Sequence, residues 1–271
     1  MNKYKQIVVS EIADNLFLGE MKIKNGKSFN LDLLNELSNF FMEVFNKTNN
    51  NGENRVFAIM GEKNSGVFNV GGDLKLFLNL VEHRDSLSLL KYGENCIKLI
   101  EKSLNAKNHN MTTAAIINGN ALGGGFESAL ACDIIIAEED FEIALPEVRL
   151  GFFPGMGAFE LLSKRIGLQQ TKKFILGGKT FKTNELYEMG VFDYLVKQNS
   201  GVEKLKEVIK KERKFQVTNN SIRKINDRQS PIKYEDLRNT LDLWIESILS
   251  ISNVQKKLIK KTIEQQNKKF L

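Results

Sequence analysis

The chain has 271 residues, of which 42% are hydrophobic and 27% are charged, and its formal net charge is +6. This length suffices for one substantial core, or for one domain with a helical appendage, and the composition excludes a disordered chain. No apolar run reaches the ~18 residues of a membrane span, and the N-terminal apolar stretch is too short for a signal peptide.

The cysteines and histidines predict neither a disulfide scaffold nor a metal site. Cys96 and Cys132 are interpreted as free thiols of a reducing compartment, so we expect a cytoplasmic protein. His83 and His109 are isolated from each other and from both cysteines. We therefore expect no metal and no cofactor.

Positive charge is concentrated at the C-terminal end. Residues 201–271 contain 17 Lys and Arg against 9 Asp and Glu, while the first 200 residues have a small acidic excess. Such a segment can meet nucleic acid, an anionic membrane or an acidic protein, and it can equally be a set of solvated helix faces. No zinc-finger or RNA-recognition pattern accompanies it, so nucleic acid is not the expected partner.

The first half of the chain alternates between strand-like and helix-like patterns. Residues 6–23 are rich in Val, Ile and Phe and predict strands, and residues 29–47 have apolar side chains at helical spacing. A polar loop is expected over 48–54 and a short apolar strand over 55–62. A helical region follows at about 73–106, with Asp73 placed to cap its first turn.

The second half continues this alternation and then becomes helical. Residues 112–119 and 133–140 contain apolar runs, and residues 157–167 predict a helix that stops at Gly167. The pattern is then mostly helical, with one short strand expected over 192–196.

The order of elements predicts the fold class. Strands that alternate with helices, followed by a helical tail, are typical of an α/β core with a helical C-terminal subdomain. We place the core at residues 1–200 and the helical subdomain at residues 201–271, where the composition shifts.

A glycine pair, Gly71-Gly72, and a glycine triplet, 123–125, stand at the start of helix-like segments. Gly72 precedes Asp73, and Gly124 precedes a run of small apolar residues. Their spacing fits neither a dinucleotide fingerprint nor a P-loop. Glycine permits close approach of the backbone, and N–H groups at a helix start are free to bind an anion. If both N–H groups point at one oxygen they form an oxyanion hole; otherwise the glycines mark two tight turns.

Two glutamates have apolar neighbours. Glu127 lies in "GGGFESALA" and Glu147 directly follows a proline in "IALPEVRLGFFPG". Apolar surroundings raise the pKa of a carboxyl group, and two such groups facing one cavity make an acid/base pair. Each alone can equally be a structural carboxylate. By contrast, Glu138, Glu139 and Asp140 form a charge run that predicts solvated side chains in a loop.

Together these stretches resemble the crotonase (enoyl-CoA hydratase/isomerase) superfamily. The likeness covers roughly residues 55–197 and is carried by "FNVGGDLKLF", "INGNALGGGFESALACDIIIAEE" and "LPEVRLGFFPGMGAFELLSKRIG". It implies a crotonase-like ββα spiral core and an enzyme that acts on acyl thioesters. It also implies that Glu127 and Glu147 are the catalytic pair and that Gly72 and Gly124 supply the oxyanion-hole N–H groups.

Within the superfamily the chain is most similar to diffusible signal factor synthases, which make 2-unsaturated fatty acids as cell–cell signals. This likeness is carried by "FNVGGDL", by Met-Gly-Ala in "FFPGMGAFELL" and by the Trp-containing "LRNTLDLWIESILSIS". It implies a dehydratase and thioesterase that acts on 3-hydroxyacyl groups carried by acyl carrier protein. The residues that it implies bind the substrate are Gly71, Leu122, Gly123, Met156 and Trp244.

Two alternatives stay open. The chain can be an enoyl-CoA hydratase or isomerase of fatty-acid metabolism that uses coenzyme A thioesters, or a catalytically idle binding protein that uses its basic tail. The charge of residues 201–271 favours an acidic carrier protein as partner. The resemblance also implies a homo-oligomer, either a trimer or a hexamer.

Overall fold

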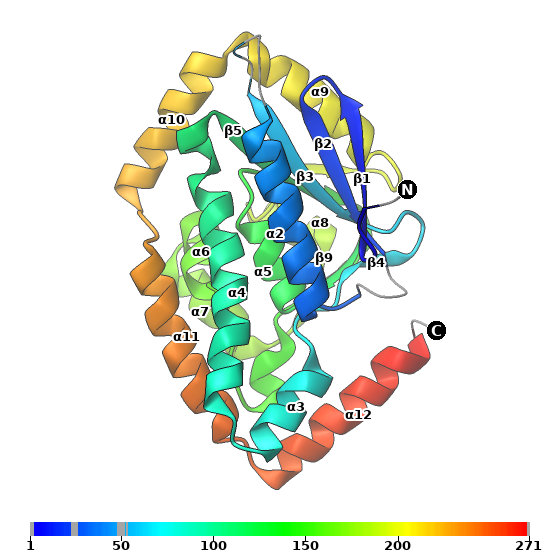
Figure 1. The fold of residues 1–271 in the computed structure, drawn as a ribbon, viewed down its shortest axis with the longest axis vertical. Coiled ribbons are helices and arrows are strands. Elements are labelled where there is room, and N and C mark those ends of the chain that lie inside the picture. Colours follow the sequence, from blue (N-terminus) through cyan, green and yellow to red (C-terminus); the bar gives the residue numbers. More distant parts are fainter. Residues whose placement is uncertain (1–2, 23–26, 48–51, 53, 270–271) are drawn as a thin grey trace.

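The computed structural model describes residues 3–22, 27–47, 52 and 54–269, which form two β-sheets surrounded by helices (Figure 1). Within these residues the larger sheet has six strands in the order β1-β2-β3-β5-β7-β10, and the smaller sheet has four in the order β4-β6-β8-β9. β1 and β9 run antiparallel to their neighbours, and the other strand pairs are parallel.

The strands and helices have the following bounds. The larger sheet comprises β1 (Ile7–Ala13), β2 (Leu16–Met21), β3 (Arg55–Gly61), β5 (Met111–Ile117), β7 (Ile134–Glu138) and β10 (Tyr194–Val196). The smaller sheet comprises β4 (Gly66–Asn69), β6 (Gly119–Leu122), β8 (Glu142–Ala144) and β9 (Thr180–Lys182). The helices before residue 200 are α2 (Leu31–Asn46), α3 (Leu74–Glu82), α4 (Ser86–Asn105), α5 (Gly124–Leu130), α6 (Ala158–Ile166), α7 (Leu168–Gly177) and α8 (Thr183–Glu188). The C-terminal helices are α9 (Gly201–Lys214), α10 (Gln216–Gln229), α11 (Tyr234–Leu249) and α12 (Asn253–Lys269).

A three-part unit repeats along the chain. Three times, a strand of the larger sheet is followed by a strand of the smaller sheet and then by helical structure. The units are β3-β4-α3, β5-β6-α5, and β7-β8 followed by a 3-10 helix (Pro146–Leu150) and α6. This repeat is the expected ββα spiral, so the prediction of an α/β core with C-terminal helices is confirmed.

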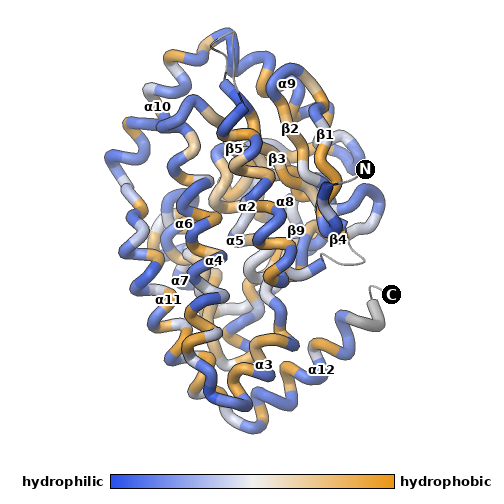
Figure 2. Tube along the Cα trace, viewed as in Figure 1, coloured by the Kyte–Doolittle hydropathy of each residue, from blue (hydrophilic) through white to orange (hydrophobic). Residues whose placement is uncertain are grey.

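Both faces of the larger sheet are buried. In β3, Val56 and Ala58 face a core that includes side chains of α9, whereas Phe57 and Ile59 face the larger core that includes side chains of α2 and α4. Successive side chains of a strand point to opposite faces, so a strand covered on both sides is a continuous apolar run. Figure 2 shows these strands largely in orange, while α10 and α12 are largely blue.

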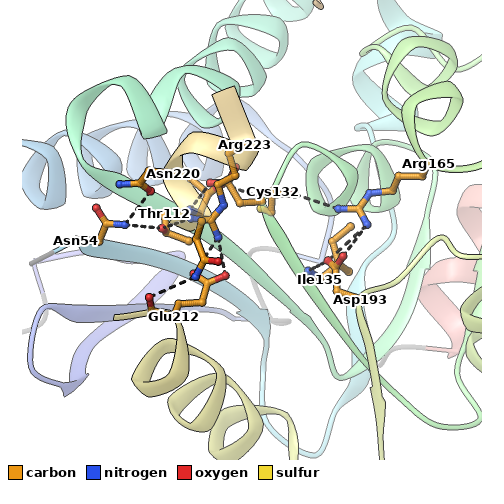
Figure 3. A network of polar contacts seen from close by, with 12 residues as sticks. Asn54, Thr112, Cys132, Ile135, Arg165, Asp193, Glu212, Asn220 and Arg223 are labelled. Atoms are coloured by element: carbon orange, nitrogen blue, oxygen red, sulfur yellow. Dashed lines mark hydrogen bonds and ion pairs between the residues drawn. The ribbon is translucent and has the colours of Figure 1, made fainter. Parts of the chain in front are cut away.

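Polar contacts hold α9 and α10 against the larger sheet (Figure 3). Arg223 of α10 donates to Thr112 Oγ1 of β5 at 3.1 Å and to Glu212 Oε1 of α9 at 2.8 Å. Farther along the chain, α11 packs against α4 and contributes side chains to the larger core. The division of the chain at residue 200 stays a prediction.

Most expected elements before residue 200 are confirmed. Asp73 caps α3 by accepting the Leu76 N–H at 3.0 Å, and α6 ends at Gly167. The helical region expected over 73–106 consists of α3 and α4, because Arg84 between them has a positive φ that redirects the chain. The loop expected over 48–54 lies mainly outside the described residues.

The expectation of a solvated charge run is wrong for Glu138. This residue ends β7, and its side chain is only 4% exposed. Its carboxylate accepts the N–H groups of Asn199 at 2.8 Å and Gly201 at 3.0 Å, where α9 begins. The carboxylate lies at the positive end of the α9 helix dipole and therefore stabilises the start of that helix, 63 residues later in the chain.

Candidate active site

Glu127 is buried in the first turn of α5. Its side chain is 1% exposed, and Oε1 accepts the N–H groups of Met156 at 2.9 Å and Ala158 at 3.0 Å. These two donors lie just before and at the start of α6, so the carboxylate links α5 to the loop that enters α6. The Oε1 atom is consequently fixed in position by two hydrogen bonds from the same loop.

Glu147 lies in the first turn of the 3-10 helix, directly after Pro146. Proline suits this place because the first N–H groups of a helix have no partner within it. The Oε2 atom of Glu147 is buried and has no hydrogen-bond partner among the described residues. Leaving a buried carboxylate oxygen unpaired costs free energy, so its presence indicates a site that binds a ligand.

Burial raises the pKa of both carboxyl groups above the usual range. For Glu127 burial is the largest cause and the nearby charge of Glu147 the second, while the N–H groups of Met156 and Ala158 oppose them. For Glu147 burial is the dominant cause, opposed by its own backbone N–H. The two groups titrate as a pair, and each favours its protonated form more than a solvated glutamate does. Such a pair is suited to hold and release protons near neutral pH.

Gly72 and Gly124 bring two backbone N–H groups to one place. Gly124 is the first residue of α5, so its N–H has no partner inside the helix. A Cβ atom at Gly124 would lie 3.5 Å from the Gly72 nitrogen and 2.4 Å from Met156 Cε. Parallel pairing of β4 with β6 brings the two loops together. Two N–H groups in this arrangement can bind one oxygen that carries negative charge.

Gly123 and Gly71 occupy backbone conformations that side chains resist, with φ of +49° and +91°. A Cβ atom at Gly123 would lie 2.3 Å from Glu147 Oε1, and one at Gly71 would lie 2.7 Å from the Leu122 carbonyl oxygen. Gly123 thus leaves the space into which the Glu147 carboxylate projects.

A narrow cavity of about 30 Å³ lies between these groups, with room for one or two water molecules. Of the expected substrate-binding residues, Met156 and Trp244 line it, whereas Gly71, Leu122 and Gly123 do not. Gly71 and Gly123 each directly precede a lining glycine in the sequence. The lining residues are Gly72, Phe77, Tyr92, Gly93, Gly124, Glu127, Glu147, Phe152, Gly155, Met156, Leu241 and Trp244.

Tyr92 and Phe77, which form an aromatic wall of this cavity, were not predicted as site residues from the sequence. The hydroxyl of Tyr92 in α4 donates to the Phe29 carbonyl at 2.5 Å. The centroid of the Phe77 ring in α3 lies 4.9 Å from that of Tyr92 and 5.3 Å from that of Trp244. Tyr92 and Phe77 belong to the buried faces of amphipathic helices, where helical spacing predicts core packing and nothing more. No signal in the sequence distinguishes them from other core residues.

Within the described ranges, no cluster of three or more His, Cys, Asp or Glu side chains is placed to hold a metal ion. No helix of these residues is long and apolar enough to cross a membrane. The expectation of a cytoplasmic protein that needs neither metal nor cofactor stays a prediction.

Replacing Glu127 by Gln is expected to make the protein relatively more stable as the pH rises. Because the pKa of Glu127 is raised, the folded state binds more protons than the unfolded chain above about pH 4. The free energy of unfolding of the wild type therefore falls with increasing pH until the group has ionised. Glutamine keeps an oxygen for the two backbone N–H groups but does not titrate.

Urea unfolding of both proteins between about pH 5 and pH 8 measures this difference. As the pH rises, the free energy of unfolding of Glu127→Gln should increase relative to that of the wild type, by up to ~1.4 kcal/mol per pH unit for one proton. If the difference between the two free energies of unfolding is independent of pH, Glu127 ionises normally in the folded state.

Sequence comparison places the chain in a known family. The family model described as Enoyl-CoA hydratase/isomerase matches residues 15–262. A Bacillus subtilis protein named "Probable enoyl-CoA hydratase" is 33% identical over 135 residues, 50% of each chain. The fatty acid oxidation complex subunit alpha of Aliivibrio fischeri is 34% identical over 128 residues, 46% of this chain and 18% of that protein. The match thus spans about half the length, or less, of these curated relatives.

Solved structures show the same fold. The enoyl-CoA hydratase of Bacillus halodurans matches with a TM-score of 0.76 and 21% identity, covering 95% of this chain and 100% of that one. The decarboxylase domain of CurF from Lyngbya majuscula matches with a TM-score of 0.73 and 15% identity, covering 95% and 99%. The fold therefore serves more than one reaction. Because the family model covers nearly the whole sequence, the chain belongs to the enoyl-CoA hydratase/isomerase family.

Proposed function

We propose that the protein adds water to a 2-enoyl thioester, or eliminates it from a 3-hydroxyacyl thioester, with coenzyme A as the carrier. The observation that carries this proposal is the pair of buried carboxyl groups, Glu127 and Glu147, beside the N–H groups of Gly72 and Gly124 in one cavity. Membership of the family and the hydratase name of the Bacillus subtilis relative support it.

The chemistry follows from these groups. The two N–H groups bind the thioester carbonyl oxygen and hold the negative charge that develops on it, and one such donor is worth ~3–4 kcal/mol. In hydration, one glutamate removes a proton from water as the water oxygen bonds to the β-carbon, and the other gives a proton to the α-carbon. In elimination, the α-proton leaves to one glutamate and the hydroxyl departs with the proton of the other.

Mass spectrometry of the products tests the proposal. The protein is incubated with 2-enoyl-CoA and, separately, with 3-hydroxyacyl-CoA, and Glu147→Gln serves as the inactive control. The expected product differs from the substrate by one water and remains a thioester. If wild type changes neither substrate, the proposal is wrong, and tight binding of polyanions without turnover would then favour a binding protein that uses its basic tail.

A second function is the release of a 2-unsaturated fatty acid from acyl carrier protein, as in diffusible signal factor synthases. One observation favours it: Met156 and Trp244, which that resemblance assigns to substrate binding, both line the cavity. The relatives described above carry hydratase and fatty-acid-oxidation names, so they favour the first function. If the products contain a free 2-unsaturated acid that forms mainly from the acyl carrier protein substrate, the second function is the correct one.

The basic helix α12 suggests how an acidic carrier would be attracted. It carries Lys256, Lys257, Lys260 and Lys261, and it packs against α3 and the 3-10 helix that contains Glu147. We expect kcat/KM for an acyl carrier protein substrate to fall about tenfold or more between about 0.05 M and about 0.5 M NaCl. The uncharged acyl-pantetheine is the control and should show little change. Equal salt profiles for the two substrates would contradict steering by α12.

The homo-oligomer implied by the resemblance also stays a proposal. Apolar side chains of Phe215, Ile222 and Ile225 lie exposed on or beside α10, at helical spacing, which supports association through this helix. Size-exclusion chromatography with light scattering of the full chain determines whether it is a monomer, a trimer or a hexamer.

A further inference from the structure

The loop that supplies the Gly72 N–H group is aligned by a short segment just before α2. Phe29 forms a parallel β-bridge with Gly72, and the Phe29 N–H donates to the Gly71 carbonyl at 2.7 Å. Two residues before Phe29, the Lys27 carbonyl accepts the Val70 N–H at 2.7 Å. The two segments therefore run side by side, joined through their backbones.

This pairing does not use the Gly72 N–H group. In a parallel bridge of this kind the hydrogen bonds go to the residues on either side of Gly72, and here the bond to Gly71 is one of them. The Gly72 nitrogen lies instead beside the start of α5, 3.5 Å from the position of a Cβ atom at Gly124. The orientation of the Gly72 N–H consequently depends on how the Phe29 segment is held.

Tyr92 of α4 holds the Phe29 segment. The Tyr92 side chain is buried, and its hydroxyl donates to the Phe29 carbonyl at 2.5 Å. Burial raises the pKa of Tyr92, so the hydroxyl keeps its proton and stays a donor. The hydroxyl oxygen also lies against the loop itself, since a Cβ atom at Gly72 would be 3.5 Å from it.

The Tyr92 hydroxyl is not placed to bind the substrate carbonyl itself. A tyrosine hydroxyl has one proton to donate, and here the Phe29 carbonyl accepts it. The ring is held separately by Phe77, with the two ring planes at 86° and their centroids 4.9 Å apart. A phenylalanine at position 92 would thus keep the ring contact and lose only the hydrogen bond.

We propose that Tyr92 is a positioning residue of the oxyanion hole. By holding the Phe29 carbonyl, it keeps the neighbouring loop in the orientation that points the Gly72 N–H at a bound carbonyl oxygen. This inference rests on the proposed function, which places the thioester carbonyl at Gly72 and Gly124. Donors fixed in advance stabilise developing charge because they need no reorganisation, so a loosened Gly72 loop loses part of that stabilisation.

Infrared spectroscopy of a bound carbonyl group tests this role. The probe is the ketone analogue of butyryl-CoA, in which a methylene group replaces the thioester sulfur, with and without carbon-13 at the carbonyl. This analogue can be neither hydrated, dehydrated nor cleaved, so the difference spectrum does not depend on turnover. Hydrogen bonds to a carbonyl oxygen lower its stretching frequency, and in wild type the frequency should be lower than for the free analogue in water.

In Tyr92→Phe about half of this downshift, or less, should remain, because two well-aimed donors are reduced to one. Tyr187→Phe is the matched control: it removes the same hydroxyl from an exposed side chain of α8 and should keep the full downshift. Kinetics give a second readout. Tyr92→Phe should lower kcat for hydration of 2-enoyl-CoA about tenfold or more with KM changed little, and Tyr187→Phe should change neither.

Other results would overturn the positioning role. A full downshift in Tyr92→Phe means that the hydroxyl is structural only, even if the variant unfolds at a lower urea concentration, and the proposed function then stands. No downshift in wild type also excludes the role, because no carbonyl is then bound between the two N–H groups. If the downshift is halved in Tyr92→Phe but wild type alters no thioester, the proposed function is wrong and the positioning role stands.

Discussion

Replacing Glu147 by Gln is expected to lower kcat for hydration of 2-enoyl-CoA by about 10²–10⁴-fold, with KM changed little. Glutamine has nearly the same shape but can neither take up nor release a proton at this position. The buried Oε2 atom has no hydrogen-bond partner among the described residues, so the substitution breaks no hydrogen bond of that atom there. Stability should be retained or increased, because an ionisable group with a raised pKa is removed from an apolar site.

A stopped assay of enoyl-CoA hydration between about pH 5 and pH 9 measures this effect. Glu142→Gln is the matched control: it makes the same substitution five residues earlier, where Glu142 is half-exposed and lies 3.7 Å from Lys182. That variant should stay within about twofold of wild type, since surface ion pairs contribute little. If Glu147→Gln keeps more than a tenth of the wild-type kcat, Glu147 is not a proton-transfer group and the proposed mechanism is wrong.

The residues of the candidate site could be singled out from the sequence because they stand at local junctions. Gly72 directly precedes the residue that caps α3, and Gly124 is the first residue of α5. Glu147 follows a proline that begins a helical turn. Each of these signals depends on neighbours in the sequence, which a single chain displays. The strands of the larger sheet could be predicted for a similar reason, since burial on both faces makes them continuous apolar runs.

The convergence of these groups could not be predicted from spacing. Gly72 and Gly124 lie side by side because β4 pairs with β6, and both strands have only four residues. A strand of three or four residues is too short to show an alternation of apolar and polar residues, so no strand of the smaller sheet was predicted from the sequence pattern. Only the family resemblance placed the two N–H groups together.

Long-range burial explains the remaining differences. Tyr92 and Phe77 resemble any other buried residues of amphipathic helices, and only the packing of α3, α4 and α11 turns them into a cavity wall. Glu138 resembles its charged neighbours, yet the start of α9 lies over it and supplies two N–H donors. A carboxylate that caps a distant helix has no signature near it in the sequence.

Replacing Gly123 by Ala is expected to reduce kcat/KM about 100-fold or more by displacing the Glu147 carboxylate. The added methyl group would lie 2.3 Å from Glu147 Oε1, so that carboxylate must move, and a displacement of about 1 Å can cost 10²-fold in rate. The positive φ of Gly123 also makes alanine strained, at about 1–3 kcal/mol of stability. Activity and stability must therefore be separated.

Gly190→Ala separates them. Gly190 has a φ of +81°, but a Cβ atom there meets nothing within 4 Å, so this variant bears the backbone strain alone. Both variants should lose comparable stability in urea unfolding, and only Gly123→Ala should lose activity. The double variant Gly123→Ala/Glu147→Gln gives the stricter result, because two residues that act through one carboxylate are not additive. If Gly123 acts by leaving room for Glu147, adding Gly123→Ala to Glu147→Gln costs almost no further activity; a further 100-fold loss would mean that Gly123 matters for another reason.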